Sequence, residues 1–355
     1  MKIFMVHEDP WHAGNPYIFT LIEEIKRQHP ESVVSWGRDL FWSDEIYTYD
    51  IVHFHWPNAF MAGDPHSEKD LLLHIDNMHK KGVKIVATCH DLEPHYNQCS
   101  DHAEAMAIVY NHADAIFHLG DYSKSLFEKK YEDAKHFFIP HHLYDTVYRF
   151  FPSKEESATY LGLPINKKYI LCFGTFRSDE ERNLVIRLSR ELGDRSIRFL
   201  APGFMDINLP RKSFAGIKQR LWKKYIQFKY GIYCTGRSFA PVSDEDVPYY
   251  YGICDIAFIQ RVKILNSGNA FMPMLFGKVV VGPDTGNVGM TLKKWGYPVF
   301  DVNNLSTVCV AVQKGLDMSR QKLPSNEIQN KQKGVYSTKN IMEKLYSFYC
   351  ETINN

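Results

Sequence analysis

The chain has 355 residues, more than one hydrophobic core usually serves, so two domains are expected. Hydrophobic residues make up 45% of it and charged residues 23%, the balance of an ordinary globular protein. The formal net charge of +1 gives no general attraction to nucleic acid, and no apolar run approaches the roughly 18 residues that a membrane-spanning helix needs.

The first 150 residues alternate between short apolar strands and amphipathic helices. Strands are predicted over KIFMVH, SVVSWG, DIVHFHWP, KIVATCHD, AIFHLG and HFFIPHH. The helix SEKDLLLHIDNMHKKG has Ser67 as its N-cap and Gly82 at its end. Short strands that alternate with helices are typical of a parallel sheet covered on both faces.

A stretch over residues 145–166 looks like a linker, and the alternation restarts at Tyr169. Strands are predicted over KYILCFGTF, IRFLAPG, YGIYCTG, DIAFIQ and VVVGPD, and helices close the chain at TVCVAVQKGLDM and STKNIMEKLYSFYCETI. We therefore predict the α/β class with two doubly wound, Rossmann-like parallel-sheet domains that face a central cleft. They comprise residues 1–150 and 151–335, and a C-terminal helix (336–355) packs back on the first domain.

The cysteines are odd in number and show no zinc-ligand spacing, which indicates reduced thiols in a cytosolic protein. They are Cys89, Cys99, Cys172, Cys234, Cys254, Cys309 and Cys350. The start of the chain, MKIFMVHEDPW, leads directly into a strand with no signal peptide. We expect a cytoplasmic protein without a resident metal or cofactor.

Small polar residues, NSGN, lie between the strand IAFIQ and an apolar helix that ends near Gly277. A helix N-terminus attracts anions, and a glycine there lets a phosphate approach the backbone closely. Ser267, Gly268 and Asn269 are thus candidates for a phosphate site, and an ordinary capped helix start is the structural alternative. The turn GPDTGNVG, after the next strand, offers further backbone donors.

Two arginines flank the loop that follows the strand ILCFG. Arg177 and Arg182 would lie at the carboxyl end of that strand, and an arginine fork suits phosphate oxygens. Together they could balance a diphosphate without a metal. The alternative for Arg182 is a local ion pair with an acidic residue of the loop, SDEER.

Histidines gather at the strand ends of the first domain. His90 and Asp91 form the most informative pair, because an imidazole and a carboxylate at a strand end can bind sugar hydroxyls or move a proton. We interpret four other histidines near these strand ends as structural: His53, His55, His141 and His142. Gly14, in the first loop, would either let a substrate approach the backbone or form a turn.

One segment, residues 210–231, carries seven basic residues among large apolar ones and no acidic residue. Such a helix can lie on an anionic membrane surface. The alternative is a solvated helix whose apolar side packs on its own domain.

Several stretches together resemble glycosyltransferases of the two-Rossmann (GT-B) type, close to family 4 of the retaining enzymes and to its bacterial cell-surface polysaccharide branch. The matching stretches occur in family order over most of residues 1–305. They are DIVHFHWP, ATCHDLEPH, HADAIFHLGDYSKSLF, FIPHHLYDTVY, YLGLPINKKYILCFGTFR, VSDEDVPYYYGICDIAFIQ and NSGNAFMPMLFGKVVVGPDTGNVG.

The resemblance implies a nucleotide-sugar donor held by the second domain and an acceptor held mainly by the first. Arg177 resembles the arginine that binds donor phosphates, and Arg182 stands near the family's lysine. Residues 267–269 resemble its phosphate loop, and His90 resembles the histidine at the sugar-transfer point. Many relatives carry two glutamates near this loop, where this chain has Ile264 and Met272.

Together with these features, the resemblance implies metal-independent, retaining transfer of a hexose from a nucleoside-diphosphate sugar to a growing bacterial glycan, itself lipid-linked. The enzyme would work at the cytoplasmic face of the membrane. Two alternatives stay open. One is a sugar-nucleotide epimerase of the same fold, and the other is a non-catalytic subunit that binds a glycan or a partner transferase.

Overall fold

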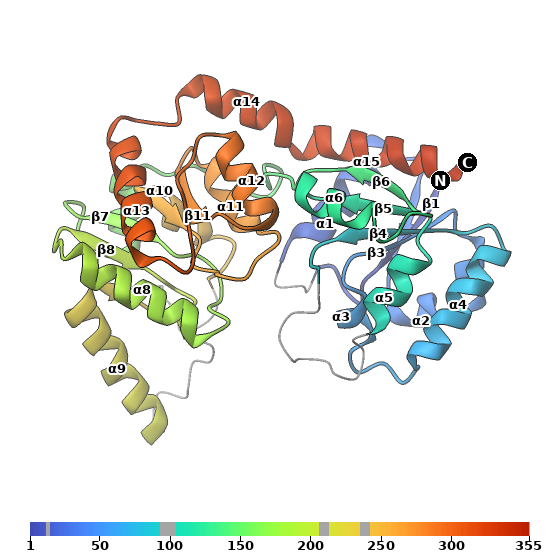
Figure 1. The fold of residues 1–355 in the computed structure, drawn as a ribbon, viewed down its shortest axis with the longest axis horizontal. Helices are drawn as coiled ribbons and strands as arrows, with labels where there is room; N and C mark the ends of the chain where they lie inside the picture. Colours follow the sequence, from blue (N-terminus) through green and yellow to red (C-terminus); the bar gives the residue numbers. More distant parts are fainter. Residues whose placement is uncertain (12–14, 93–103, 206–212, 235–241, 355) are drawn as a thin grey trace. The chain divides into compact units, whose positions relative to one another are not determined.

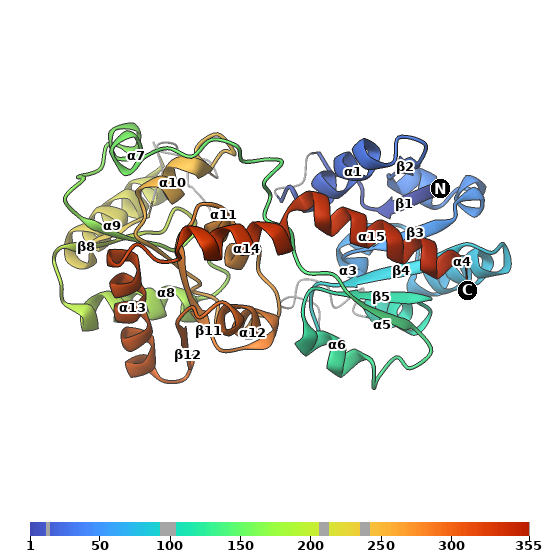
Figure 2. The same ribbon diagram turned by 90° about the horizontal axis from the view of Figure 1, so that it is seen from above.

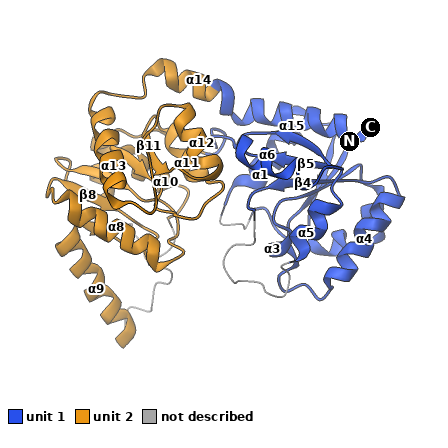
Figure 3. Cartoon of the chain, in the orientation of Figure 1, with its two compact units in different colours: residues 1–147, 334–355 blue, residues 148–333 orange. Residues whose placement is uncertain are grey.

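Two six-stranded parallel sheets form the framework of the chain (Figures 1 and 2). The computed structural model describes residues 1–11, 15–92, 104–205, 213–234 and 242–354. The chain divides into two units: unit 1 comprises residues 1–147 and 334–355, and unit 2 comprises residues 148–333 (Figure 3). The prediction of two doubly wound parallel sheets is confirmed.

Unit 1 has the strand order β2-β1-β3-β4-β5-β6. Its strands are β1 (Lys2–Val6), β2 (Val33–Ser35), β3 (Ile51–Phe54), β4 (Lys84–Cys89), β5 (Ala115–His118) and β6 (Lys135–Phe138). Its first helices are α1 (Tyr17–Gln28), α2 (Arg38–Phe41), the 3-10 turn η1 (Asp44–Thr48), α3 (Pro57–Met61), α4 (Glu68–Lys80), α5 (Glu104–Asn111) and α6 (Asp121–Phe127). Ser67 caps α4 as predicted, because its hydroxyl accepts from the Asp70 N–H at 3.3 Å.

The last helix, α15 (Thr338–Ile353), belongs to unit 1 and packs against α1. The Tyr349 hydroxyl lies 2.5 Å from Nδ1 of His53, inside the core. The ring of Phe348 stacks on Phe137 of β6 at 4.2 Å. These apolar and polar contacts hold the two ends of the chain in one core.

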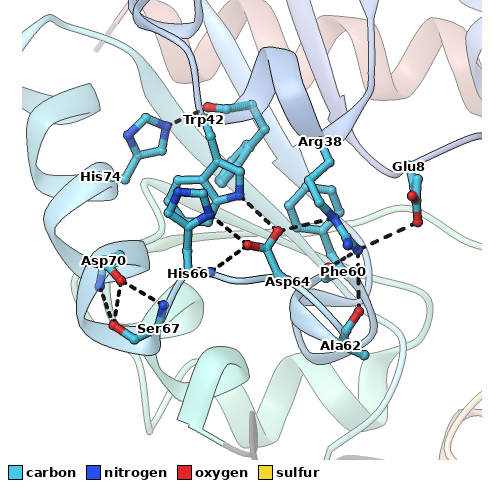
Figure 4. Close-up of polar contacts among 11 residues, drawn as sticks. Glu8, Arg38, Trp42, Phe60, Ala62, Asp64, His66, Ser67, Asp70 and His74 are labelled. Atoms are coloured by element: carbon cyan, nitrogen blue, oxygen red, sulfur yellow. Dashed lines mark hydrogen bonds and ion pairs between the residues drawn. The ribbon is translucent and has the colours of Figure 1, made fainter.

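A buried carboxylate organises the side of unit 1 around α2 (Figure 4). The Asp64 side chain is fully buried and accepts from the indole N–H of Trp42 at 3.0 Å and from the backbone N–H of His66 at 2.9 Å. Arg38 forms an ion pair with it at 3.2 Å and donates to the Phe60 carbonyl at 2.7 Å. Burial alone would raise the pKa of Asp64, but these hydrogen bonds and the Arg38 charge outweigh it and lower the pKa.

Unit 2 has the strand order β12-β11-β10-β7-β8-β9. Its strands are β7 (Lys168–Leu171), β8 (Ile197–Leu200), β9 (Ile232–Tyr233), β10 (Ile256–Phe258), β11 (Val279–Pro283) and β12 (Val299–Phe300). Its helices are α7 (Lys154–Leu161), α8 (Asp179–Leu192), α9 (Phe214–Tyr230), α10 (Val247–Ile253), α11 (Gly268–Leu275), α12 (Gly286–Lys294) and α13 (Leu305–Arg320).

A further helix, α14 (Asn326–Tyr336), was not predicted from the sequence. The boundary between unit 2 and unit 1 falls within this helix, between Lys333 and Gly334. The Gln332 amide, on its inner side, donates to the Tyr297 hydroxyl at 3.1 Å. No helix in the described part of the chain combines the length and apolar character needed to cross a bilayer.

Candidate functional site

The centre of unit 2 is a topological switch point between β7 and β10. These strands are neighbours, and the chain continues from β7 toward β8 and β9 on one side and from β10 toward β11 and β12 on the other. Ligands of open α/β sheets bind beyond the carboxyl ends of the strands at such a point. The helices that begin there are α8, after β7, and α11, after β10.

The start of α11 is tied directly to the turn that follows β7. Ser267 is the N-cap, and its hydroxyl accepts from the Asn269 N–H at 3.2 Å. The Asn269 side-chain amide donates to the Phe173 carbonyl at 2.7 Å. The next residue, Gly174, has φ +87°, and a Cβ there would lie 3.1 Å from that amide nitrogen. The structure thus brings the predicted residues 267–269 to the end of β7.

A second helix start lies beside the first. The Asn287 N–H donates to the Leu265 carbonyl at 3.0 Å, and its side-chain amide donates to Asn266 Oδ1 at 2.9 Å. Gly286 has φ +55°, and a Cβ there would meet the Ile264 carbonyl oxygen at 2.9 Å. The loop after β10 is therefore held between the starts of α11 and α12, whose positive dipole ends favour an anion.

Arg177 follows β7, and its side chain is exposed at the start of α8. Its backbone N–H donates to Oε2 of Glu181 at 2.8 Å. Glu181 is buried, with 1% of its surface exposed. Burial raises the pKa of this carboxyl, although the Arg177 N–H and the charges of Arg261, Arg177 and Arg182 act in the opposite direction. The charges of three arginines therefore act on one buried acid.

Arg182 has three local acceptors. Its Nε donates to the Phe204 carbonyl at 2.9 Å, and another nitrogen donates to the Phe176 carbonyl at 3.1 Å. The third contact is an ion pair with Asp179 at 3.1 Å, the local partner that the sequence left open. This guanidinium joins the loops after β7 and β8, and its role toward a donor stays a prediction.

Two residues after β10 were missed at the sequence level. Arg261 is half-buried and close enough to Glu181 for its charge to act on that carboxyl. Gln260 is 1% exposed, and its amide nitrogen lies 3.4 Å from the Phe173 carbonyl. Its Oε1 has no hydrogen-bond partner among the described residues. The signal was available, because Arg261 follows the strand IAFIQ much as Arg177 follows ILCFGTF.

The corresponding edge of unit 1 carries a row of histidines. His7 follows β1, His55 follows β3 and His90 follows β4, which are adjacent parallel strands. Val6 pairs in register with Phe54, so His7 and His55 occupy equivalent positions one residue further on. Nδ1 of His55 lies 3.0 Å from Nε2 of His90. Burial lowers the pKa of His55 to about 3 and also lowers the pKa of His7.

His90 lies inside an aromatic cluster rather than on an open surface. It is 7% exposed and stacks on the Trp56 ring at 4.1 Å. The buried Tyr17 ring contacts it edge-on at 5.1 Å and stacks on His142 at 5.0 Å. Burial lowers the pKa of His141, another neighbour of Tyr17, to about 4. His141 and His142, whose pKa values burial lowers, are therefore neutral near pH 7.

Asp91 follows His90 and is half-buried. Its backbone carbonyl accepts from the Cys89 thiol at 3.7 Å. Burial, with a contribution from the Asp91 carboxylate, raises the pKa of Cys89 to about 12. The charge of the Asp91 carboxylate therefore acts on Cys89, the last residue of β4. Gly14, the remaining candidate, lies outside the described residues.

The six cysteines within the described ranges are free thiols. Within the same ranges, no group of three or more His, Cys, Asp or Glu side chains is arranged to hold a metal ion. The polar edge of unit 2 thus consists of helix starts, arginines and the buried Glu181, whereas that of unit 1 consists of buried imidazoles with Asp91 next to them in the chain.

Comparison with known proteins gives likenesses of structure only. No protein-family model matches the sequence, and no curated protein matches it either. A sucrose-phosphate synthase from Thermosynechococcus elongatus superposes with a TM-score of 0.73 at 13% identity, over 99% of this chain and 98% of that chain. Anabaena HepE in complex with UDP gives a TM-score of 0.65 at 14% identity, over 99% of this chain and all of that one.

A UDP-N-acetylglucosamine 2-epimerase from Listeria monocytogenes, described as putative, gives a TM-score of 0.58 at 12% identity. This likeness covers 97% of this chain and 94% of that chain. Identities this low show the fold alone. The chain therefore has the GT-B fold, with two doubly wound parallel sheets that each end in a polar, carboxyl-terminal edge.

Proposed function

We propose that the protein is a glycosyltransferase that moves a sugar from a nucleoside-diphosphate sugar to an acceptor glycan. The observation that carries this proposal is the edge of unit 2, where the start of α11 is bonded to the turn after β7, the start of α12 is bonded to the loop after β10, and Arg177 follows β7. A diphosphate fits such a site, because backbone N–H groups and guanidinium groups both donate to phosphate oxygens.

In this proposal, residues 267–269 and Arg177 bind the donor diphosphate, and Arg182 and Arg261 add to the positive field. Bond cleavage leaves additional negative charge on the departing diphosphate. Fixed donors at that position stabilise the transition state more than the bound donor, which lowers the barrier. HepE, a protein of the same fold, has been crystallised with UDP and with UDP-glucose, which supports this class of donor.

Unit 1 would supply the acceptor side. His90 would bind a hydroxyl of the sugar or the departing phosphate, and its bond to His55 would fix the orientation of the ring. Asp91 and Gly14 would lie near the acceptor. The resemblance to family 4 supports a growing bacterial glycan on a lipid carrier as acceptor, a hexose as the transferred sugar and retention of configuration.

The test is a thermal-shift screen of the full chain against UDP, GDP, CMP and dTDP sugars. A ligand at one hundred times its Kd stabilises the folded state by about 2.7 kcal/mol. We expect one nucleotide class to raise the Tm and its free nucleoside diphosphate to do so as well. If none of these ligands raises the Tm, the proposed donor site is wrong, and the proposed function is wrong with it.

A sugar-nucleotide epimerase is the second candidate, favoured by the likeness to the Listeria protein. It would use the same diphosphate site but would need no acceptor. Incubation with the stabilising donor alone separates the two candidates. An epimerised nucleotide sugar would identify an epimerase, whereas product that forms only with added glycan acceptor would identify a transferase.

A further inference from the structure

Helix α9 of unit 2 presents a large apolar surface to solvent. It lies beside α8 (Figure 1) and also contacts β9, and its buried residues are Gly216, Lys223 and Ile226. The opposite side carries Phe214, Leu221 and Phe228, which are 85%, 65% and 93% exposed. The alternative that the apolar side of this helix packs on its own domain therefore holds only for its narrow inner face.

The exposed apolar residues form one continuous strip. They recur at spacings of three, four, four and three residues, which places them on one face of an α-helix. The strip consists of Phe214, Ile217, Leu221, Tyr225 and Phe228. Isolated exposed apolar residues are ordinary, but a contiguous strip of this kind marks an interaction surface.

Cations border the strip on both sides. Four basic residues of α9 are exposed, and the helix contains no acidic residue. They are Lys218, Arg220, Lys224 and Lys229. An apolar strip with a cationic border is the pattern of a helix that lies in the plane of an anionic bilayer.

An open cavity of about 1110 Å³ adjoins the C-terminal end of the strip. Phe228, the last residue of the strip, is part of its wall, as are Lys224 and Lys229. Arginines from the end of α8 and the start of β8 complete the wall: Arg190, Arg195 and Arg198. Asp194 is the one acidic residue among the described residues that line it. Such a cavity suits phosphate groups at the depth of lipid headgroups.

We propose that α9 and this cavity dock unit 2 on an anionic phospholipid bilayer. The strip enters the headgroup region, and the basic side chains bind lipid phosphates. A second copy of the chain fits less well, because a symmetric contact of α9 with itself would bring two cationic borders together. Nucleic acid fits less well too, because phosphates would leave Ile217 and Leu221 in water. The inference does not depend on the proposed function.

The test is sedimentation of the full chain with vesicles, without any nucleotide sugar. We expect binding to an equal mixture of phosphatidylglycerol and phosphatidylcholine at low salt, and little binding to phosphatidylcholine alone or at high salt. Arg220→Gln with Lys224→Gln should weaken binding by roughly fivefold for each cation removed. Leu221→Ser with Phe228→Ser should weaken it by about tenfold or more.

Matched controls come from exposed residues of unit 1. Leu73→Ser on α4 replaces a leucine that is 57% exposed, and Lys81→Gln with Lys129→Gln removes two exposed cations. Both should bind vesicles as the unmodified chain does, and circular dichroism should show all variants folded. The proposal is overturned if the chain ignores phosphatidylglycerol at low salt, or if the α9 variants bind like the controls. A dimer that the Leu221 and Phe228 changes dissociate, without vesicle binding, would identify a second copy as the partner instead.

Discussion

Unit 1 carries all 16 histidines of the chain, and unit 2 carries none. Both units end their sheets in a polar edge at a topological switch point. In unit 1 that edge is lined by imidazoles such as His55 and His90, packed among aromatic rings. In unit 2 it is lined by arginines and by the starts of α11 and α12.

The comparison shows how one architecture can serve two chemistries. Arginine keeps its charge at any physiological pH, so the edge of unit 2 suits a ligand that is always anionic. A buried neutral imidazole both donates and accepts a hydrogen bond, which suits the hydroxyl groups of a sugar. If the proposed function holds, the division between donor and acceptor follows this difference in side chains.

Acid should affect unit 1 far more than unit 2. Burial lowers the pKa of five histidines by a large amount: His53, His55, His118, His141 and His142. In the unfolded chain these histidines become protonated below pH about 6.5. In the native state His118 and His141 become protonated only as the pH approaches about 3 and about 4. The free energy of unfolding of unit 1 should therefore fall as the pH drops below about 6.5.

At pH 5.5 the loss is about 1 kcal/mol for each such histidine, or several kcal/mol in all. Hydrogen exchange followed by mass spectrometry at pH 7.5 and 5.5, with intrinsic rates corrected for pH, checks this peptide by peptide. Peptides of β3 and β4 should lose protection, while those of β7 and β10 serve as the internal control. Equal loss in both units would show that the histidines do not set the difference.

His90→Ala tests the edge of unit 1 in function. We expect turnover with the true acceptor to fall by about two orders of magnitude, the scale of a lost hydrogen bond to a transition state. Donor affinity should change little, because the diphosphate would be held by unit 2. Steady-state kinetics with both substrates varied separates the two quantities.

Two further variants serve as controls for the His90→Ala experiment. His112→Ala, directly after α5, removes a histidine whose Nδ1 bonds the Ile108 carbonyl of that helix, and it should leave turnover unchanged. His90→Gln keeps a hydrogen-bonding side chain and should recover part of the activity if His90 positions a hydroxyl. Full turnover in folded His90→Ala protein would make this histidine structural.

The fold could be predicted because its signal is local. Apolar strands alternate with helices, and caps such as Ser67 mark helix boundaries. α14 was missed because NEIQNKQKGVY contains only two large aliphatic residues, which is too few to show a helical period. Its inner face is held instead by a polar contact, from Gln332 to Tyr297.

The site could be predicted only in part, for the opposite reason. Helix starts after strands locate residues 267–269 and Arg177, but side-chain partners depend on contacts that are distant in sequence. Asn269 donates to the carbonyl of Phe173, 96 residues earlier. Arg182 donates hydrogen bonds to the backbone carbonyls of Phe204 and Phe176, which no local sequence pattern indicates. The burial of Glu181, on which the charges of three arginines act, is likewise a property of the folded unit.

Arg177→Ala probes the anionic preference of unit 2. Loss of a charge-assisted hydrogen bond should weaken binding of the nucleoside diphosphate by about 1.5–3 kcal/mol, or roughly ten- to a hundredfold in Kd. Binding of the nucleoside without phosphates should barely change. Isothermal titration calorimetry measures both, with Arg187→Ala, an exposed arginine on α8, as the matched control. Unchanged diphosphate affinity in Arg177→Ala would place the donor site elsewhere.

Arg182→Ala should have the smallest effect on the donor and a clearer effect on stability. Three of its N–H groups are already engaged by Phe204, Phe176 and Asp179, so it acts on a diphosphate mainly through its charge. We expect a loss in diphosphate affinity of about threefold, on the scale of an indirect electrostatic contact. The two carbonyls lose their donors, which should lower the free energy of unfolding by about 1–3 kcal/mol. Calorimetric titration and thermal unfolding of the same preparation measure the two effects side by side. An affinity loss as large as that of Arg177→Ala, with an unchanged Tm, would mean that Arg182 turns from these carbonyls to bind the donor directly.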